Sequence, residues 1–304
     1  MTDQNLCRVL TGPTGIGKSE WALALADENG WAILCMDSMQ SYRRMDIGTA
    51  KPTPADRARV PHHLLDLVEP SESFSVAAYA EAAEKAIQDC ARRGKGCLFV
   101  GGTGLYLDAM MHGLSMGGFQ ADPARRQEML ALGETPEGRR ALMNRLRALD
   151  PVTASRLPEG DVRRVIRAIE VTEKTGVPFS AQTRENGSSH RWIVVSLTMQ
   201  REHLYRRINE RTERMMRGGL PEEVEGLLRE GVPEDAQSMQ AIGYRQVIPL
   251  LRGSCTEAET LREIQTATRH YAKRQMTFLR REPSVIYLDA ENPDIASHLR
   301  KAME

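Results

Sequence analysis

Short apolar runs alternate with amphipathic stretches along the first third of the chain. Leu6–Leu10, Trp31–Met36 and Cys97–Val100 are apolar runs of the length of a strand. Lys18–Glu28 and Val76–Arg92 lie between them and carry apolar residues at the three- and four-residue spacing of a helix. Strands that alternate with helices predict βαβ units, so we expect an α/β fold with a parallel sheet flanked by helices.

The pattern changes near residue 116. From Asp122–Pro123 to about Thr175 the chain is rich in Arg, Leu and Ala and has no strand-like run, which predicts a helical insertion domain. Asp150–Pro151 and Leu157–Pro158 are expected to divide this insertion into short helices. Trp192–Leu197 is apolar again, and we expect this strand to rejoin the sheet.

Three parts follow from this pattern. We expect a first core segment at residues 1–115, the helical insertion at residues 116–190 and a second core segment at residues 191–304. The second core segment is expected to contain helices at 201–217, 222–229 and 256–281, and a last strand at 285–288.

Composition narrows the class of protein. The 304 residues are 41% hydrophobic and carry 41 Lys and Arg against 41 Asp and Glu, as expected of a globular chain with a sizeable core. No apolar run approaches the roughly 18–20 residues that a membrane helix needs, so we expect no membrane contact. The five cysteines are odd in number and lack C-x-x-C spacing, which argues against disulfides or a zinc site and favours a cytoplasmic location.

A glycine-rich segment follows the first predicted strand and opens the first predicted helix. It matches the phosphate-loop pattern G-x-x-x-x-G-K-[ST] at every fixed position, through Gly12, Pro13, Thr14, Gly15, Ile16, Gly17, Lys18 and Ser19. Glycines let backbone amides converge on phosphate oxygens, and the helix N-terminus and Lys18 add positive charge. The Ser19 hydroxyl suits Mg²⁺. We therefore predict a P-loop NTPase-like sheet with a phosphate site and Mg²⁺ as cofactor.

The position of the acidic residues argues against an ordinary ATPase or GTPase. Those enzymes need a carboxylate at the end of a nearby strand, but the third predicted strand ends in Gly101–Gly104 without one. Asp37 follows the second predicted strand at the sheet edge where α/β proteins bind ligands. Its carboxylate is a candidate magnesium ligand or general base, and the alternative is a cap or turn residue.

Several strings beyond the P-loop resemble a known family, the bacterial tRNA dimethylallyltransferases (tRNA isopentenyltransferases). The strings follow one another in order over nearly the whole chain and occupy residues 37–52, which include DIGTAKP, and residues 61–66, 100–106, 242–246 and 271–275. The resemblance implies transfer of a dimethylallyl group from dimethylallyl diphosphate to the exocyclic amine of the adenosine adjacent to the anticodon in tRNA. The P-loop would then hold the departing diphosphate.

The resemblance also implies catalytic roles. Asp37 matches the proposed general base, and Thr103 matches a residue near the reacting amine. Lys18, Mg²⁺ at Ser19 and Arg211 would stabilise the charge that develops on diphosphate. Arg211 could instead be a solvated charge on an Arg-rich helix.

Contacts with tRNA are implied for a larger set. The acceptor base must leave its stack to reach a pocket, and the Gln40 amide could pair with a base edge. The matching residues are Asp37, Ser38, Met39, Gln40, Thr103, Arg125, Arg163, Arg164, Val165, Ile166, Arg167, Ala241, Ile242, Gly243, Tyr244, Arg245 and Gln246. At Arg163 the chain departs from the family pattern, which usually has Gln there.

Zero net charge does not exclude a tRNA partner, because the charge is unevenly distributed. Residues 1–115 have a net charge of −3, residues 116–190 of +2 and residues 191–304 of +1, so the basic excess lies where tRNA is expected. Arg outnumbers Lys 34 to 7, which favours bidentate recognition, although the bias of a GC-rich genome explains this ratio equally well.

Three other functions fit parts of the sequence. A relative that prenylates free adenylate would need neither the insertion nor the basic C-terminal helix. A P-loop small-molecule kinase would turn over ATP, and a P-loop nucleic-acid-binding switch would bind without chemistry. One long chain with the whole set of motifs is expected to act as a monomer.

Overall fold

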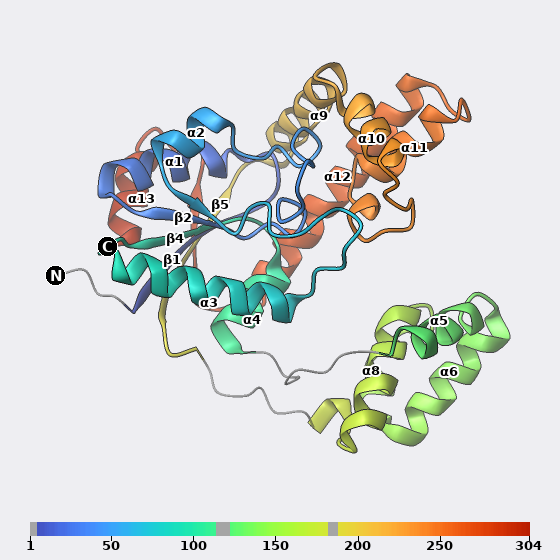
Figure 1. The fold of residues 1–304 in the computed structure, drawn as a ribbon. Coiled ribbons are helices and arrows are strands. Elements are labelled where there is room, and N and C mark those ends of the chain that lie inside the picture. Colours follow the sequence, from blue (N-terminus) through green and yellow to red (C-terminus); the bar gives the residue numbers. More distant parts are fainter. Residues whose placement is uncertain (1–4, 114–121, 182–187) are drawn as a thin grey trace. The chain divides into compact units, whose positions relative to one another are not determined.

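The computed structural model describes residues 5–113, 122–181 and 188–304 (Figure 1). The chain forms two compact units, Met1–Met111 with Ser188–Glu304, and His112–Gly187. The expected boundary between residues 115 and 116 lies outside the described residues. The second unit ends at Gly187, three residues before the end that the sequence pattern predicts for the insertion.

The described residues of the first unit contain a six-stranded sheet in which neighbouring strands run parallel. Its order is β3-β2-β4-β1-β5-β6. The strands are β1 (Leu6–Thr11), β2 (Ala32–Cys35), β3 (His62–His63), β4 (Cys97–Val100), β5 (Arg191–Thr198) and β6 (Val285–Asp289). The predicted parallel sheet is therefore confirmed, and β5 rejoins it beside β1. Sequence pattern did not predict β3, because two residues have no periodicity.

Both faces of this sheet are covered by helices, which explains why its strands are almost continuously apolar. On one face α1 (Lys18–Asn29) and α13 (Ile295–Met303) pack against side chains that include Leu10, Ile33, Leu98 and Val195. On the other, α3 (Val76–Arg92) and α4 (Gly104–His112) pack against side chains that include Val9, Leu34, Phe99 and Val194.

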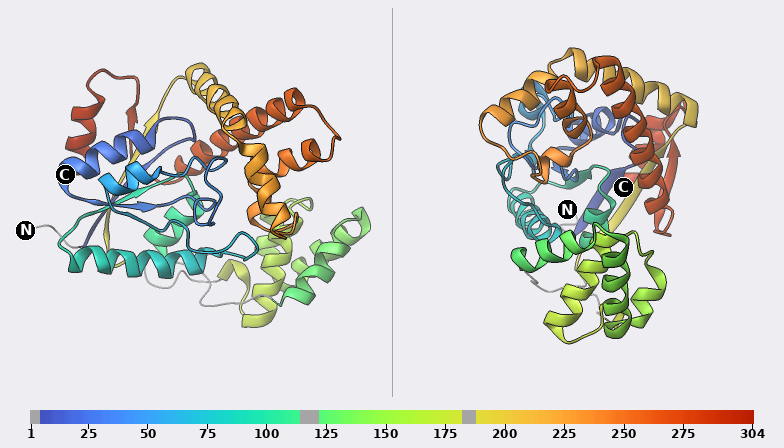
Figure 2. Two further views of the ribbon diagram at one scale, coloured as in Figure 1. Left: turned by 45° about the horizontal axis from the view of Figure 1, so that its top comes forward. Right: turned by 90° about the vertical axis from the view of Figure 1, so that its right-hand side faces the viewer.

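Four helices of the second core segment pack together: α9 (Arg201–Arg217), α10 (Leu220–Arg229), α11 (Tyr244–Leu251) and α12 (Glu257–Leu279). They gather beyond one end of the sheet in Figure 1 and in the left view of Figure 2. The predicted helices 201–217, 222–229 and 256–281 are confirmed within two residues at each end. A short helix, α2 (Pro54–Arg59), and a 3₁₀ turn at Ser238–Gln240 complete the first unit's helical elements among the described residues.

The second unit is helical where it is described, as the sequence predicts. It contains α5 (Pro123–Leu132), α6 (Pro136–Leu149), α7 (Pro151–Arg156), α8 (Val162–Thr175) and a 3₁₀ turn at Phe179–Ala181. Its own core includes Met129, Leu142, Leu146 and Ile169. Asp150 divides α6 from α7: its carboxylate accepts hydrogen bonds from Thr153 N (3.0 Å) and Ser180 N (2.6 Å). In neither unit do the described helices include one that is long and apolar enough to span a membrane.

Candidate active site

The P-loop joins the carboxyl end of β1 to α1 through a backbone that requires glycine. Gly12 has φ +132°, and a Cβ there would lie 2.7 Å from the Leu197 carbonyl oxygen. Lys18 Nζ donates to Gly12 O (3.0 Å) and Pro13 O (2.9 Å), so the ammonium folds back over its own loop. Burial, assisted by the nearby Arg211 guanidinium and opposed by Asp37, lowers the pKa of Lys18 to about 7. A bound anion would reverse this shift, as expected for a phosphate site.

Arg211 reaches the same loop from α9, so the structure brings together two predicted catalytic cations. Its Nη1 donates to Thr14 Oγ1 at 3.2 Å. Burial lowers the pKa of Arg211, and the Asp37 carboxylate acts in the opposite direction. Because this guanidinium is held at the P-loop and away from bulk water, it is not the solvated helix charge that the sequence left open.

Gln275 on α12 links the P-loop to the loop after β4. Its Oε1 accepts from Thr14 N (2.8 Å), and its Nε2 donates to Gly102 O (2.9 Å). A Cβ at Gly102 would lie 1.9 Å from Gln275 Nε2, so this close contact requires glycine. The sequence did not identify Gln275 as a site residue, because nothing local shows that a helical Gln faces two backbone groups from distant loops.

Asp37 lies at the end of β2, where its two carboxylate oxygens have different surroundings. Oδ1 accepts from Met39 N (2.9 Å), which is the turn-residue role that the sequence left as an alternative. Oδ2 accepts no hydrogen bond from the described residues and is available to a ligand. Thr103 Oγ1 accepts from Ser38 N (3.1 Å). Thr103 therefore holds the segment that carries Asp37.

Two cavities meet at Asp37. The first has a volume of about 270 Å³ and lies against α9, α11 and α12, with Met39, Ile242, Tyr271, Arg245 and Arg274 among its lining residues. The second has a volume of about 220 Å³ and lies over the P-loop, with Lys18, Ser19, Leu23, Ile33 and Lys51 among its lining residues. Both are lined by Thr14, Asp37, Thr49 and Arg211. Two ligands can therefore approach Asp37 from different sides.

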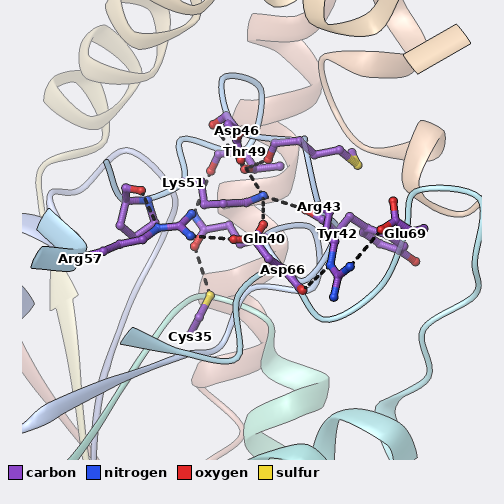
Figure 3. Close-up of polar contacts among 12 residues, drawn as sticks. Cys35, Gln40, Tyr42, Arg43, Asp46, Thr49, Lys51, Arg57, Asp66 and Glu69 are labelled. Atoms are coloured by element: carbon purple, nitrogen blue, oxygen red, sulfur yellow. Dashed lines mark hydrogen bonds and ion pairs between the residues drawn. The ribbon is translucent and has the colours of Figure 1, made fainter. Parts of the chain in front are cut away.

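A network of side chains shapes the loop that contributes Thr49 (Figure 3). Gln40 Nε2 donates to Thr49 O (3.0 Å) and Ala50 O (3.2 Å), and Gln40 Oε1 accepts from Cys35 Sγ (3.1 Å). Ala50 has φ +50°, a conformation that a non-glycine residue adopts only when its surroundings hold it there. The Gln40 amide is thus engaged within the protein, and its pairing with a base edge stays a prediction.

Lys51 is the buried centre of the same network (Figure 3). Its side chain is 1% exposed, and Nζ donates to Tyr42 O (2.7 Å) and pairs with Asp46 (2.7 Å) and Asp66 (2.8 Å). A buried ammonium is tolerated only when it is paired and hydrogen-bonded in this way. The polar groups therefore hold the DIGTAKP segment in one shape.

Glu223 on α10 holds the other side of that segment. Its Oε2 accepts from Asp46 N (2.9 Å) and Ile47 N (2.8 Å). Its Oε1 accepts from Gly48 N (3.2 Å) and from the Tyr244 hydroxyl. One carboxylate thus connects two of the strings on which the family resemblance rests, and no local pattern around Glu223 predicts this role.

The expected contact segment at residues 241–246 divides into structural and exposed positions. Tyr244 is completely buried, and the buried Gln246 accepts a hydrogen bond from Gly243 N (2.9 Å). Ala241, Ile242, Gly243 and Arg245 line the first cavity. The Tyr244 side chain therefore belongs to the fold, and the tRNA contacts implied for this segment stay predictions.

The remaining expected tRNA contacts lie on the second unit. Val165 and Ile166 are buried in its core, so their side chains position α8 and offer no surface to a ligand. Arg125 pairs with Glu173, which also pairs with Arg145. Arg163 and Arg164 are exposed, and Arg167 is half-buried. The tRNA roles of these arginines stay predictions.

The residues at the P-loop fit a magnesium ion for which the protein supplies only a few of the coordinating oxygen atoms. Ser19 and Asp37 both line the second cavity and offer hard oxygen atoms, the donors that Mg²⁺ prefers. No group of three or more His, Cys, Asp or Glu in the described parts of the chain could hold a metal by itself. Diphosphate and water would therefore supply most of the ligands.

Comparison with known proteins gives consistent matches. The profile described as IPP transferase matches residues 40–282. The tRNA dimethylallyltransferase of Geobacter metallireducens is 46% identical over 285 residues, which cover 92% of this chain and 91% of that protein. The same enzyme name belongs to a protein of Pelotomaculum thermopropionicum that is 43% identical over 286 residues, 93% of this chain and 90% of that protein.

Solved structures show the same fold. The tRNA isopentenylpyrophosphate transferase of Bacillus halodurans has 36% identity and a TM-score of 0.72, and the match covers 99% of this chain and 97% of that one. A eukaryotic dimethylallyltransferase described as acting on tRNA has 26% identity and a TM-score of 0.80, with 98% of this chain and 77% of that one covered.

Proposed function

Because the chain belongs to the IPP transferase family, we propose that it transfers a dimethylallyl group from dimethylallyl diphosphate to tRNA. The acceptor is the exocyclic amine of the adenosine adjacent to the anticodon, and diphosphate is released. The observation that carries this proposal is the position of Asp37, which lines both the first cavity, beside α12, and the second cavity, over the P-loop.

The P-loop side suits the leaving group. Lys18 and Arg211 both reach the P-loop, where they would stabilise the charge that develops on diphosphate as the carbon–oxygen bond breaks. The lowered pKa of Lys18 supports this assignment, since diphosphate would favour its charged form. Magnesium held by diphosphate and Ser19 would add further positive charge there.

The α12 side suits the acceptor. The exocyclic amine is a weak nucleophile because its lone pair is delocalised into the purine, so a base that removes its proton helps the reaction. Asp37 Oδ2 is the oxygen available for that proton, while Oδ1 stays in its turn with Met39 N. Thr103 is a positioning residue, because it holds Ser38 N next to Asp37.

Mass analysis of tRNA nucleosides after incubation with dimethylallyl diphosphate and Mg²⁺ tests the proposal. We expect dimethylallyl-adenosine in tRNA, and for Asp37→Asn a loss of about 10²–10⁴-fold in rate with tRNA affinity nearly unchanged. Thr277→Ala, on the exposed side of α12, is the control. Prenylation of AMP with no product in tRNA, or ATP turnover alone, would overturn the proposed acceptor or reaction.

A cytoplasmic location and a monomeric state belong to the same proposal. The five free cysteines support a reducing location. Light scattering at the working concentration checks the monomer, and a dimer mass would refute that part.

A further inference from the structure

Arg207 on α9 contacts the P-loop from outside the two cavities. Its Nε donates to Gly15 O at 3.0 Å, and a Cβ at Gly17 would lie 3.2 Å from its Nη2, so the guanidinium lies along the loop between these residues. Arg207 is exposed and lines neither the first nor the second cavity, whereas Arg211, one helical turn further along α9, lines both. Any effect of Arg207 on the site must therefore pass through the loop.

The loop segment that Arg207 contacts packs closely on α9 and has a backbone with unusual freedom of rotation. Gly15 has φ +85°, and a Cβ there would lie 2.9 Å from Ile208 Cγ1, so no larger residue fits without rearrangement. Glycine is also the residue with the widest range of backbone angles. The peptide unit between Gly15 and Ile16 can therefore turn over unless a contact from outside the loop holds it.

The orientation of this peptide unit decides whether it attracts or repels an anion. In a planar trans peptide the C=O and the following N–H point in opposite directions. Because Arg207 binds Gly15 O from outside the cavities, the Ile16 N–H is directed toward the inner side of the loop, and no group of the described residues accepts a hydrogen bond from it. Successive N–H groups turned inward in this way form an anion site. A reversed peptide unit would present a carbonyl oxygen to the same anion.

We propose that Arg207 is a positioning residue of the diphosphate site: its hydrogen bond to Gly15 O keeps the Ile16 N–H turned toward the bound anion. The inference rests on the proposed function, in which the P-loop holds diphosphate. Gln275 supports the neighbouring Thr14 N, but among the described residues Arg207 alone donates a hydrogen bond to Gly15 O. Loss of this bond should therefore weaken diphosphate binding, and the exposed position of Arg207 should leave the fold unchanged.

Two substitutions separate the hydrogen bond of Arg207 from its charge. The donor is Nε, and the Nε2 amide of glutamine occupies the same position along the side chain. Arg207→Gln therefore keeps a donor for Gly15 O without the charge, whereas Arg207→Met has a methyl group at that position and keeps neither. We expect the Kd for inorganic diphosphate, measured by calorimetry with Mg²⁺, to rise about tenfold in Arg207→Met and to stay near the wild-type value in Arg207→Gln.

Kinetics and stability distinguish this role from a purely structural one. In Arg207→Met the KM for dimethylallyl diphosphate should rise with the Kd while kcat at saturating donor changes little, because the substitution weakens binding of the diphosphate group in substrate and transition state alike. Both variants should unfold at the wild-type temperature, since the Arg207 side chain is exposed. Arg206→Met, at the exposed neighbouring position of α9, is the matched control and should bind diphosphate as the wild type does.

The remaining outcomes refute either the role of Arg207 or the proposed function. If Arg207→Met binds diphosphate as tightly as Arg206→Met does, Arg207 does not position the loop. If Arg207→Gln binds as weakly as Arg207→Met, the charge of Arg207 matters and its hydrogen bond to Gly15 O does not, which also overturns the inference. A wild type that binds diphosphate but prenylates no RNA would refute the proposed function, and the Kd values would still decide the role of Arg207.

Discussion

Gln275→Leu is the change that most directly tests how the site is assembled. The side chain is 6% exposed, and leucine of similar size removes both of its hydrogen bonds without opening a large cavity. Thr14 N–H in the P-loop and Gly102 C=O after β4 are then left without their partner. The fold should persist, but two loops that form the site lose their common support.

The magnitude follows from the burial of these two bonds. An unsatisfied buried polar group costs about 1–3 kcal/mol. The Thr14 bond is partly exposed, so its loss should cost about 1 kcal/mol. The Gly102 bond is buried, so its loss should cost about 3 kcal/mol. The sum is about 4 kcal/mol, which lowers the unfolding midpoint of the sheet unit by about 8–16 °C at about 2–4 °C per kcal/mol.

Thermal unfolding followed by circular dichroism measures this loss, and steady-state kinetics measure its effect on the site. We expect the KM for dimethylallyl diphosphate to rise, because Thr14 also accepts the hydrogen bond from Arg211. Lys273→Gln, an exposed change on the same helix, should leave both quantities unaltered. A Gln275→Leu variant that unfolds at the wild-type midpoint with an unaltered KM would refute the argument.

Two further predictions concern pH. Burial acts in the opposite direction, but hydrogen bonds from Thr153 and Ser180 lower the pKa of Asp150 from 3.8 to about 2. Asp150→Asn should therefore destabilise the second unit by about 2 kcal/mol at pH 7. Because the carboxylate's contribution is lost as pH falls from about 4 to about 2, urea denaturation should show this difference shrinking over that range; a constant difference would contradict the assignment. Lys18→Met removes an ammonium with a pKa of about 7 in the folded chain against 10.5 ordinarily. The unfolded chain binds that proton more tightly than the folded chain does. At pH values below 7 the ligand-free variant should therefore unfold at a higher temperature than the wild type. Thermal scans should show this advantage declining between pH 7 and 10.5, and a pH-independent difference would exclude the shift.

The sequence by itself determined the parts of the site that are local. The P-loop is eight consecutive residues, its glycines act through their own backbone, and the Lys18 ammonium donates to Gly12 O of the same loop. Asp37 could be placed at the ligand-binding edge because it directly follows an apolar strand of a predicted parallel sheet. The helical insertion was equally evident, since proline after aspartate marks the start of α5 and α7.

Only the tertiary structure decided which distant groups meet at that edge. Gln275 contacts Thr14 across 261 positions of sequence, and Glu223 contacts Asp46 across 177. It also decided that Tyr244 and Val165 are buried although they lie in segments expected to contact tRNA. Periodicity reports the environment of neighbours along the chain, whereas these contacts depend on strand order and helix packing. For that reason the chemistry of the P-loop was predictable, and the groups that position it were not.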